Sequence, residues 1–168
     1  MQLLEALGGV LLFFALSLVP WGVFGLGKVE AKSAAVISII CGILSVLWAA
    51  AFIYPLAVGT AAIVMSFAFA FLSAGFHFYY GINPRGHGLL CWTLAMIVGI
   101  AAALATNPAT PFLTFAFWSY FVLLVLFGGG AYIGSQSWVK GFAYFSLFVG
   151  IITTGIFGTL WALGILPP

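Results

Sequence analysis

The chain has 168 residues, of which 65% are hydrophobic and 4% are charged, and its mean hydropathy is +1.33. A soluble domain carries about 25% charged residues, so the four basic and two acidic side chains here are too few to cover a water-exposed surface. The composition therefore predicts a protein that crosses a membrane several times and forms a single domain over residues 1–168. A net charge of +2 gives no reason to expect a nucleic-acid partner.

Six segments are apolar enough to be membrane spans, since a helix needs about 20 mostly apolar residues to cross the hydrocarbon core. In chain order they are residues 7–26, 34–54, 58–80, 89–105, 112–133 and 141–163. The fourth is the shortest, and the Gly-rich turn before it is able to extend it. None alternates in polarity as the strands of a membrane barrel do, so we predict an all-α fold of six transmembrane helices.

The first segment does not have the pattern of a cleaved signal peptide. No basic segment precedes it, and Glu5 stands where positive charge is expected. We therefore count it as the first of the six spans.

All four basic residues fall in alternate turns of this six-span map. Lys28 and Lys32 lie between spans one and two, Arg85 between three and four, and Lys140 between five and six. The other two turns carry no charge. By the positive-inside rule, the basic turns are cytoplasmic and both termini face the outside of the cell.

The three basic turns also resemble one another, reading FGLGKVEAKS, YYGINPRGHG and YIGSQSWVKG. Each follows an aromatic-rich helix end, passes a glycine (Gly27, Gly81 or Gly134) and then carries a basic residue. This repeat suggests three helical hairpins of the same orientation, which are able to close around a pseudo-threefold axis that holds a pore. A compact six-span protein with short loops also shows such a pattern by chance, so both interpretations stay open here.

Groups for acid–base catalysis are nearly absent from the sequence. The only carboxylates, Glu5 and Glu30, fall at opposite membrane faces, and no base lies within the membrane to activate a serine or cysteine. The GGG triplet at 128–130 lies within span five, where close helix packing explains it better than phosphate binding. We therefore predict that the chain is not an enzyme and holds no cofactor.

The remaining reactive side chains are two histidines and two cysteines. His77 is expected near the inner end of span three and His87 in the following loop, without a cysteine or carboxylate beside them, so a metal site is not expected. Cys41 and Cys91 fall inside apolar runs and are expected to be packing residues. No span carries an ionisable group near its centre, which disfavours ion-coupled transport and favours a neutral solute moving down its gradient.

The segment GLGKVEAKSAAV at residues 25–36 resembles the first turn of the AmiS/UreI family, the urea channels and short-chain amide transporters of bacteria. The resemblance continues through Phe67–Phe71 to Gly81 and Arg85, and resumes from Trp118 through Lys140 to Gly150. It implies three hairpins around one pore per protomer, termini outside the cell, and a homo-oligomer of typically six protomers in the bacterial inner membrane.

The family's pore positions transfer to this sequence one residue at a time. By resemblance, the pore is lined by Leu7, Leu11, Phe14, Leu18, Trp21, Phe67, Phe71, Thr114, Trp118, Phe121, Val125 and Val149. The positions within spans one, three and five each fall on one helical face, as a pore requires. Aromatic packing between helices, or contact with lipid, explains the same faces.

The sequence departs from the acid-activated urea channels at several of these positions. Span five keeps only Trp118 of their tryptophans, Val149 stands where that channel has a Glu, and Trp21 stands where it has an Asn. The outer loops are too short to form a gate. The resemblance implies a passive channel for small neutral amides (urea, acetamide, formamide) that supplies a cytoplasmic amidase or urease. The departures from the acid-activated channels predict that it is open at neutral pH. A membrane subunit that scaffolds a partner protein is the alternative.

Overall fold

The six apolar segments are six long helices in the computed structural model, which describes residues 2–167. The elements are α1 (Leu3–Gly25), α2 (Ala31–Trp48), η1 (Ala49–Ile53), α3 (Val58–Tyr79), α4 (Arg85–Ala105), α5 (Pro111–Ile133), α6 (Gln136–Phe148), η2 (Val149–Ile156) and α7 (Phe157–Ala162). The two η segments are π-helices, and each continues a span without a break. Six helices are long and apolar enough to cross a membrane, which confirms the predicted fold class. The fourth starts at Arg85, inside the Gly-rich turn.

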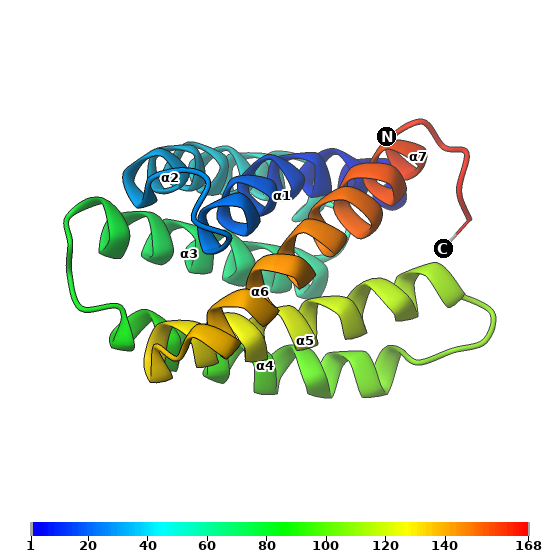
Figure 1. Ribbon diagram of the computed structural model, residues 1–168. Coiled ribbons are helices and arrows are strands. Elements are labelled where there is room, and N and C mark those ends of the chain that lie inside the picture. The colour runs from blue at the N-terminus through cyan, green and yellow to red at the C-terminus, as the bar shows by residue number, and fades with distance from the viewer. Residues whose placement is uncertain (1, 168) are drawn as a thin grey trace.

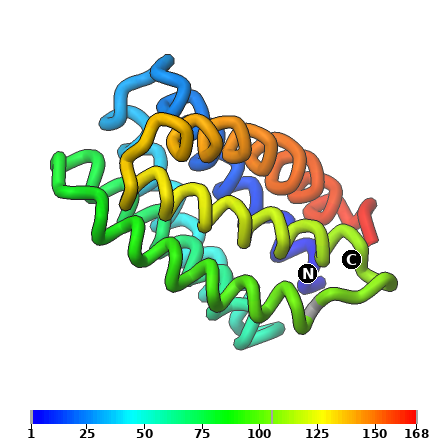
Figure 2. The backbone as a smooth tube through the Cα atoms, turned by 60° about the horizontal axis from the view of Figure 1, so that its bottom comes forward, coloured from blue at the N-terminus to red at the C-terminus, as the bar shows by residue number. Residues whose placement is uncertain are grey.

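All three basic turns lie at one end of the bundle, as Figures 1 and 2 show. Both termini and the turns that join α2 to α3 and α4 to α5 lie at the other end. We call these the basic end and the terminal end. Helices α1, α3 and α5 therefore run in the same direction, from the terminal end to the basic end.

The three repeated glycines have the same backbone conformation. Gly27, Gly81 and Gly134 have φ angles of 71°, 66° and 70°, in the left-handed region that side chains with a Cβ rarely adopt. After α1, the Lys28 amide donates to the Val23 carbonyl, and after α3, the Ile82 amide donates to the His77 carbonyl. These bonds cap the last turn of each helix. The sequence repeat therefore marks three helix ends that share the same glycine conformation.

The helices in closest contact are not the pairs joined by the basic turns. The closest neighbours are α2 with α3, α4 with α5, and α1 with the span formed by α6, η2 and α7. Helices α3 and α4 diverge from the turn that joins them, as the left side of Figure 1 shows. The bundle thus consists of three closely packed pairs, two of them joined across the terminal end.

Small residues permit these close approaches. At Gly8 of α1, an added Cβ would lie 2.3 Å from the Ala162 backbone nitrogen and 2.5 Å from the Gly158 carbonyl oxygen. In the GGG triplet, Gly128 faces the Trp92 indole and Gly129 the Trp138 indole, each closer than a Cβ allows. Small residues at helix contacts are typical of membrane proteins, where association depends on packing rather than on exclusion of water.

Hydrogen bonds between helices hold α1 in place. The Ser17 hydroxyl donates to the Ser38 hydroxyl, which donates to the Phe71 carbonyl, so one chain of bonds joins α1, α2 and α3. The Ser146 hydroxyl donates to the Leu18 carbonyl across 2.8 Å. With no water in the membrane core to compete, such bonds fix the depth of one helix against the next.

Candidate functional site

A cavity of about 330 Å³ opens from the terminal end into the bundle. Its walls come from the first halves of α1, α3 and α5, together with Trp161 of α7. The lining residues are Leu3, Leu4, Leu7, Leu11, Phe14, Thr60, Ile63, Val64, Phe67, Leu113, Ala116, Phe117, Tyr120 and Trp161. None of them is charged. A second recess, lined by Gln2, Glu5 and the segment after α7, shares Leu4 and Trp161 with the cavity and so adjoins its mouth.

Four aromatic rings close the inner end of this cavity. The Phe14 ring lies 5.9 Å from Phe67, 5.1 Å from Phe71 and 6.1 Å from Tyr120, and the Phe67 and Tyr120 rings are 4.7 Å apart. We call Phe14, Phe67, Phe71 and Tyr120 the aromatic floor. All four are at least 94% buried. One ring comes from α1, two from α3 and one from α5, so the parallel helices meet here.

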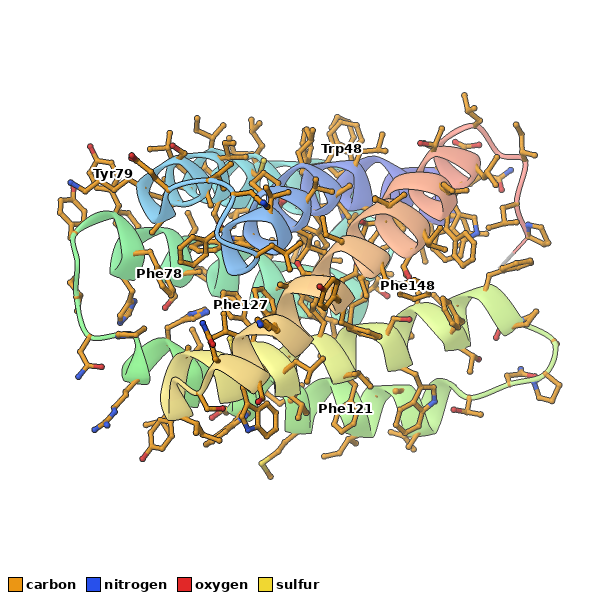
Figure 3. The ribbon with its side chains drawn as sticks, in the orientation of Figure 1. Trp48, Phe78, Tyr79, Phe121, Phe127 and Phe148 are labelled. Atoms are coloured by element: carbon orange, nitrogen blue, oxygen red, sulfur yellow. The ribbon has the colours of Figure 1, made fainter. Side chains whose placement is uncertain are left out.

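A second aromatic group lies beyond the floor, toward the basic end. The Trp21 ring is 4.9 Å from Phe78 and 5.8 Å from Phe127, and Phe127 stacks on Phe142 with centroids 4.2 Å apart and planes 15° apart. Figure 3 shows Phe78 and Phe127 in the interior of the bundle. We call Trp21, Phe24, Phe78, Phe127 and Phe142 the inner aromatic cluster.

Helix α5 presents two neighbouring faces to different surroundings. Leu113, Phe117 and Tyr120 line the cavity. On the adjacent face of the helix, Thr114, Trp118, Phe121 and Val125 lie against α4 and the turn before α5. The Trp118 indole donates to the Thr106 hydroxyl, and Thr114 bonds to Asn107. The Phe121 ring covers Gly99 of α4, and the Val125 carbonyl accepts from the Trp92 indole.

The sequence of this chain, over nearly its whole length, is matched by a known family. The family model described as "AmiS/UreI family transporter" matches residues 6–165. This chain belongs to the AmiS/UreI family. The family consists of transporters, so the prediction that the chain is not an enzyme agrees with it.

Solved structures show the same fold for this AmiS/UreI family member. The crystal structure of the urea channel from the human gastric pathogen Helicobacter pylori is similar with a TM-score of 0.79 and 23% sequence identity, over 92% of this chain and 96% of that one. The cryo-EM structure of the H. pylori urea channel in a closed state gives 0.75 and 21%, over 96% and 100%. Among curated protein sequences, none matches this chain. At this identity the likeness establishes the fold.

The residues named from the resemblance fall into three groups in the structure. Leu7, Leu11, Phe14 and Phe67 line the cavity, and Phe71 completes the aromatic floor. Leu18, Trp21 and Val149 are buried on the basic side of the floor. The four positions on α5 do not reach the cavity, because they face α4. Figure 3 shows Phe121 on that side of α5, away from Phe78 and Phe127.

The prediction that His87 lies in a loop is wrong. His87 belongs to the first turn of α4 and is fully buried, because α4 begins earlier than the apolar run. Its Nδ1 is 3.2 Å from the Ser73 hydroxyl and its Nε2 is 3.3 Å from the Cys91 sulfur. The Ser73 carbonyl lies 2.8 Å from Nδ1 of His77. A cysteine thus lies beside the histidines after all, although the described residues hold no group of three potential metal ligands.

Sequence reasoning missed most of the cavity wall. Thr60, Phe117, Tyr120 and Trp161 line the cavity and carry no pattern that separates them from neighbouring apolar positions. The available signal was the i, i+4, i+7 spacing of Leu113, Phe117 and Tyr120, which is also the spacing of Thr114, Trp118 and Phe121 on the face named from the resemblance. Because both spacings are helical, the sequence does not distinguish the two faces.

Proposed function

We propose that this chain is a passive channel for small neutral amides such as urea, acetamide and formamide. The observation that carries the proposal is the uncharged cavity between α1, α3 and α5, with its inner end closed by flat aromatic rings. An ion that enters loses hydration without gaining a compensating charge, at a cost of several kcal/mol or more. A planar neutral amide loses less hydration and packs against the rings.

The proposed path runs through the cavity, past the aromatic floor and along the inner aromatic cluster to the basic end. On α5, we propose that Leu113, Phe117 and Tyr120 line it in place of Thr114, Trp118, Phe121 and Val125. Leu7, Leu11, Phe14, Leu18, Trp21, Phe67, Phe71 and Val149 keep their proposed places along the path. Ring movement at the floor is needed for passage, since the rings are in contact.

The proposal includes the orientation of the channel in the membrane and its assembly with other protomers. The basic end, which carries Lys28, Lys32, Arg85 and Lys140, faces the bacterial cytoplasm by the positive-inside rule. The exposed apolar side chains along the helices face lipid or neighbouring protomers. By resemblance to the family, the protomers form a homo-oligomer of six. The amide delivered is available to a cytoplasmic amidase or urease.

The test is stopped-flow uptake of urea, acetamide and formamide into proteoliposomes that contain the purified chain. We expect uptake of at least one amide to exceed that of empty liposomes, with no increase in the leak of sodium or chloride. Uptake equal to that of empty liposomes for all three would reject the channel. That result would favour the alternative, a scaffold subunit for a partner protein.

A further inference from the structure

Three buried polar side-chain atoms in the described residues lack a hydrogen-bond partner. They are the Tyr120 hydroxyl on α5, the Thr153 hydroxyl on η2 and Nε1 of Trp21 on α1. A buried hydroxyl without a partner destabilises a fold, so nearly all such groups in native proteins are paired, and an exception needs an explanation. Tyr120 belongs to the aromatic floor, which places one of the three at the inner end of the cavity.

Thr153 lies at the same depth as the aromatic floor. The last span runs antiparallel to α1, and contacts on both sides of Thr153 fix its height. Gly150 packs against Leu18 and Val19 of α1, and Gly158 packs against Leu11 and Gly8. Thr153 falls between these glycines, and therefore at the level of α1 between Leu11 and Leu18. Phe14 is in the middle of that interval.

The local backbone separates Thr153 from its neighbour Thr154. Both side chains are fully buried. The Thr154 hydroxyl bonds to the Val149 and Gly150 carbonyls, 3.0 and 2.8 Å away, and so satisfies backbone acceptors of the π-helical turn. The Thr153 hydroxyl makes no such bond. π-Helical turns occur frequently at functional sites, which agrees with a side chain that is held in the interior for a purpose other than helix stability.

We propose that the hydroxyls of Tyr120 and Thr153 form a polar selectivity station at the aromatic floor, where each bonds in turn to a permeating amide. A hydroxyl donates to the amide carbonyl oxygen and accepts from its N–H groups, so the two replace part of the hydration that the solute loses. An apolar solute gains nothing from them, and an ion finds no opposite charge. The station rests on the proposed channel function and adds the residues that decide which neutral solutes pass.

Trp21 fits as the next donor along the path. It follows Phe14 by seven residues on α1, which is about 10 Å further toward the basic end. Its Nε1 is a donor only, and the Trp21 side chain is fully buried within the inner aromatic cluster. A carbonyl oxygen leaving the station therefore meets a third unpaired donor, on the face of α1 that carries Phe14.

The test replaces each hydroxyl by a side chain of the same shape. We expect Thr153→Val and Tyr120→Phe each to lower urea and acetamide uptake about fivefold, the value of one hydrogen bond. We expect Thr153→Ser, which keeps the hydroxyl, to restore most of the flux. The matched control is Thr159→Val on the same span, because Thr159 is exposed and bonds to the Gly155 carbonyl.

A thermal melt in detergent separates this role from a structural one. Replacing an unpartnered buried hydroxyl by a methyl group removes a destabilising feature, so Thr153→Val is expected to melt at the same temperature as the parent or higher while its flux falls. Parent-like uptake by both Thr153→Val and Tyr120→Phe would overturn the station, as would loss of flux accompanied by a lower melting temperature in both. If the parent itself carries no amide, the channel function fails instead.

Discussion

Phe117 and Trp118 are adjacent on α5, yet the Phe117 side chain lines the cavity whereas the Trp118 indole donates across 3.1 Å to the Thr106 hydroxyl on the α4 side. One step along a helix turns the side chain by 100°, which is enough to move it from the cavity to the helix contact. The pair therefore shows which face of α5 borders the cavity.

The first prediction tests this face. Phe117→Ala enlarges the cavity and is expected to raise uptake of bulkier amides relative to urea. Trp118→Ala is expected to leave the ratio unchanged, because it removes a contact with α4. The measurement is proteoliposome uptake of urea, acetamide and propionamide by both variants. If only Trp118→Ala changes the uptake of bulkier amides relative to urea, the path runs along the α5 face that was predicted from the resemblance.

The second prediction concerns the contact between α1 and α7. A Cβ at Gly8 would lie within 2.5 Å of backbone atoms on α7, which a side-chain rotation does not relieve. Gly8→Ala is therefore expected to cost about 1–3 kcal/mol or more of stability, measured by thermal melting in detergent. Gly59→Ala is the control, because nothing lies within 4 Å of its added Cβ. Equal melting temperatures for both variants would contradict the close approach.

A third prediction concerns the hydrogen-bonded side chains of His87, Ser73 and His77. His87→Ala removes a fully buried ring and one of the two imidazole partners of the Ser73 hydroxyl, which keeps only the 3.4 Å contact with Nδ1 of His77. The expected cost is about 2–4 kcal/mol. The ring also lies 4.6 Å from Phe127, so the inner aromatic cluster loses support. His77→Ala is the comparison, since His77 is half-buried and bonds mainly within its own turn. Thermal melts that rank His77→Ala as the more damaging change would contradict this assignment.

Orientation is tested by labelling single introduced cysteines in intact cells with a membrane-impermeant thiol reagent. Gly86→Cys lies at the basic end, where its Cβ has ordinary clearance, and Ala109→Cys lies in the turn at the terminal end. We expect labelling of Ala109→Cys only, with Gly86→Cys labelled after the cells are opened. Cys41 and Cys91 are buried, so the unmodified chain gives the background. Labelling of Gly86→Cys alone in intact cells would mean that the basic end faces outward and that the proposed orientation is wrong.

The last prediction concerns external pH. Acid gating between pH 5 and 7 usually depends on histidine, and both histidines lie toward the basic end. Within the described residues, Glu5 is the only Asp, Glu, His, Lys or Arg side chain at the terminal end. Amide flux is therefore expected to change less than about twofold between external pH 5 and 7.5 at fixed internal pH. A steep rise on acidification near pH 6 would reveal a gate at the terminal end.

Local features of the sequence determined the membrane class, the six spans, the turns and the shared end of all basic residues. These depend on the length of apolar runs, on glycines with positive φ and on charges at helix ends, and each is decided within a few residues along the chain. The segment at 25–36 also carried the family resemblance, which the match over residues 6–165 confirmed.

Only the tertiary structure decided which side of each helix faces the cavity. In a soluble helix, polar residues mark the outer face, but α5 is apolar on all sides because lipid and interior both accept apolar side chains. Nothing along the chain therefore distinguishes Tyr120 from Phe121, and their places depend on how α5 packs against α4 and α1. The same holds for His87 and Thr153, which became buried polar groups only through helices distant in sequence.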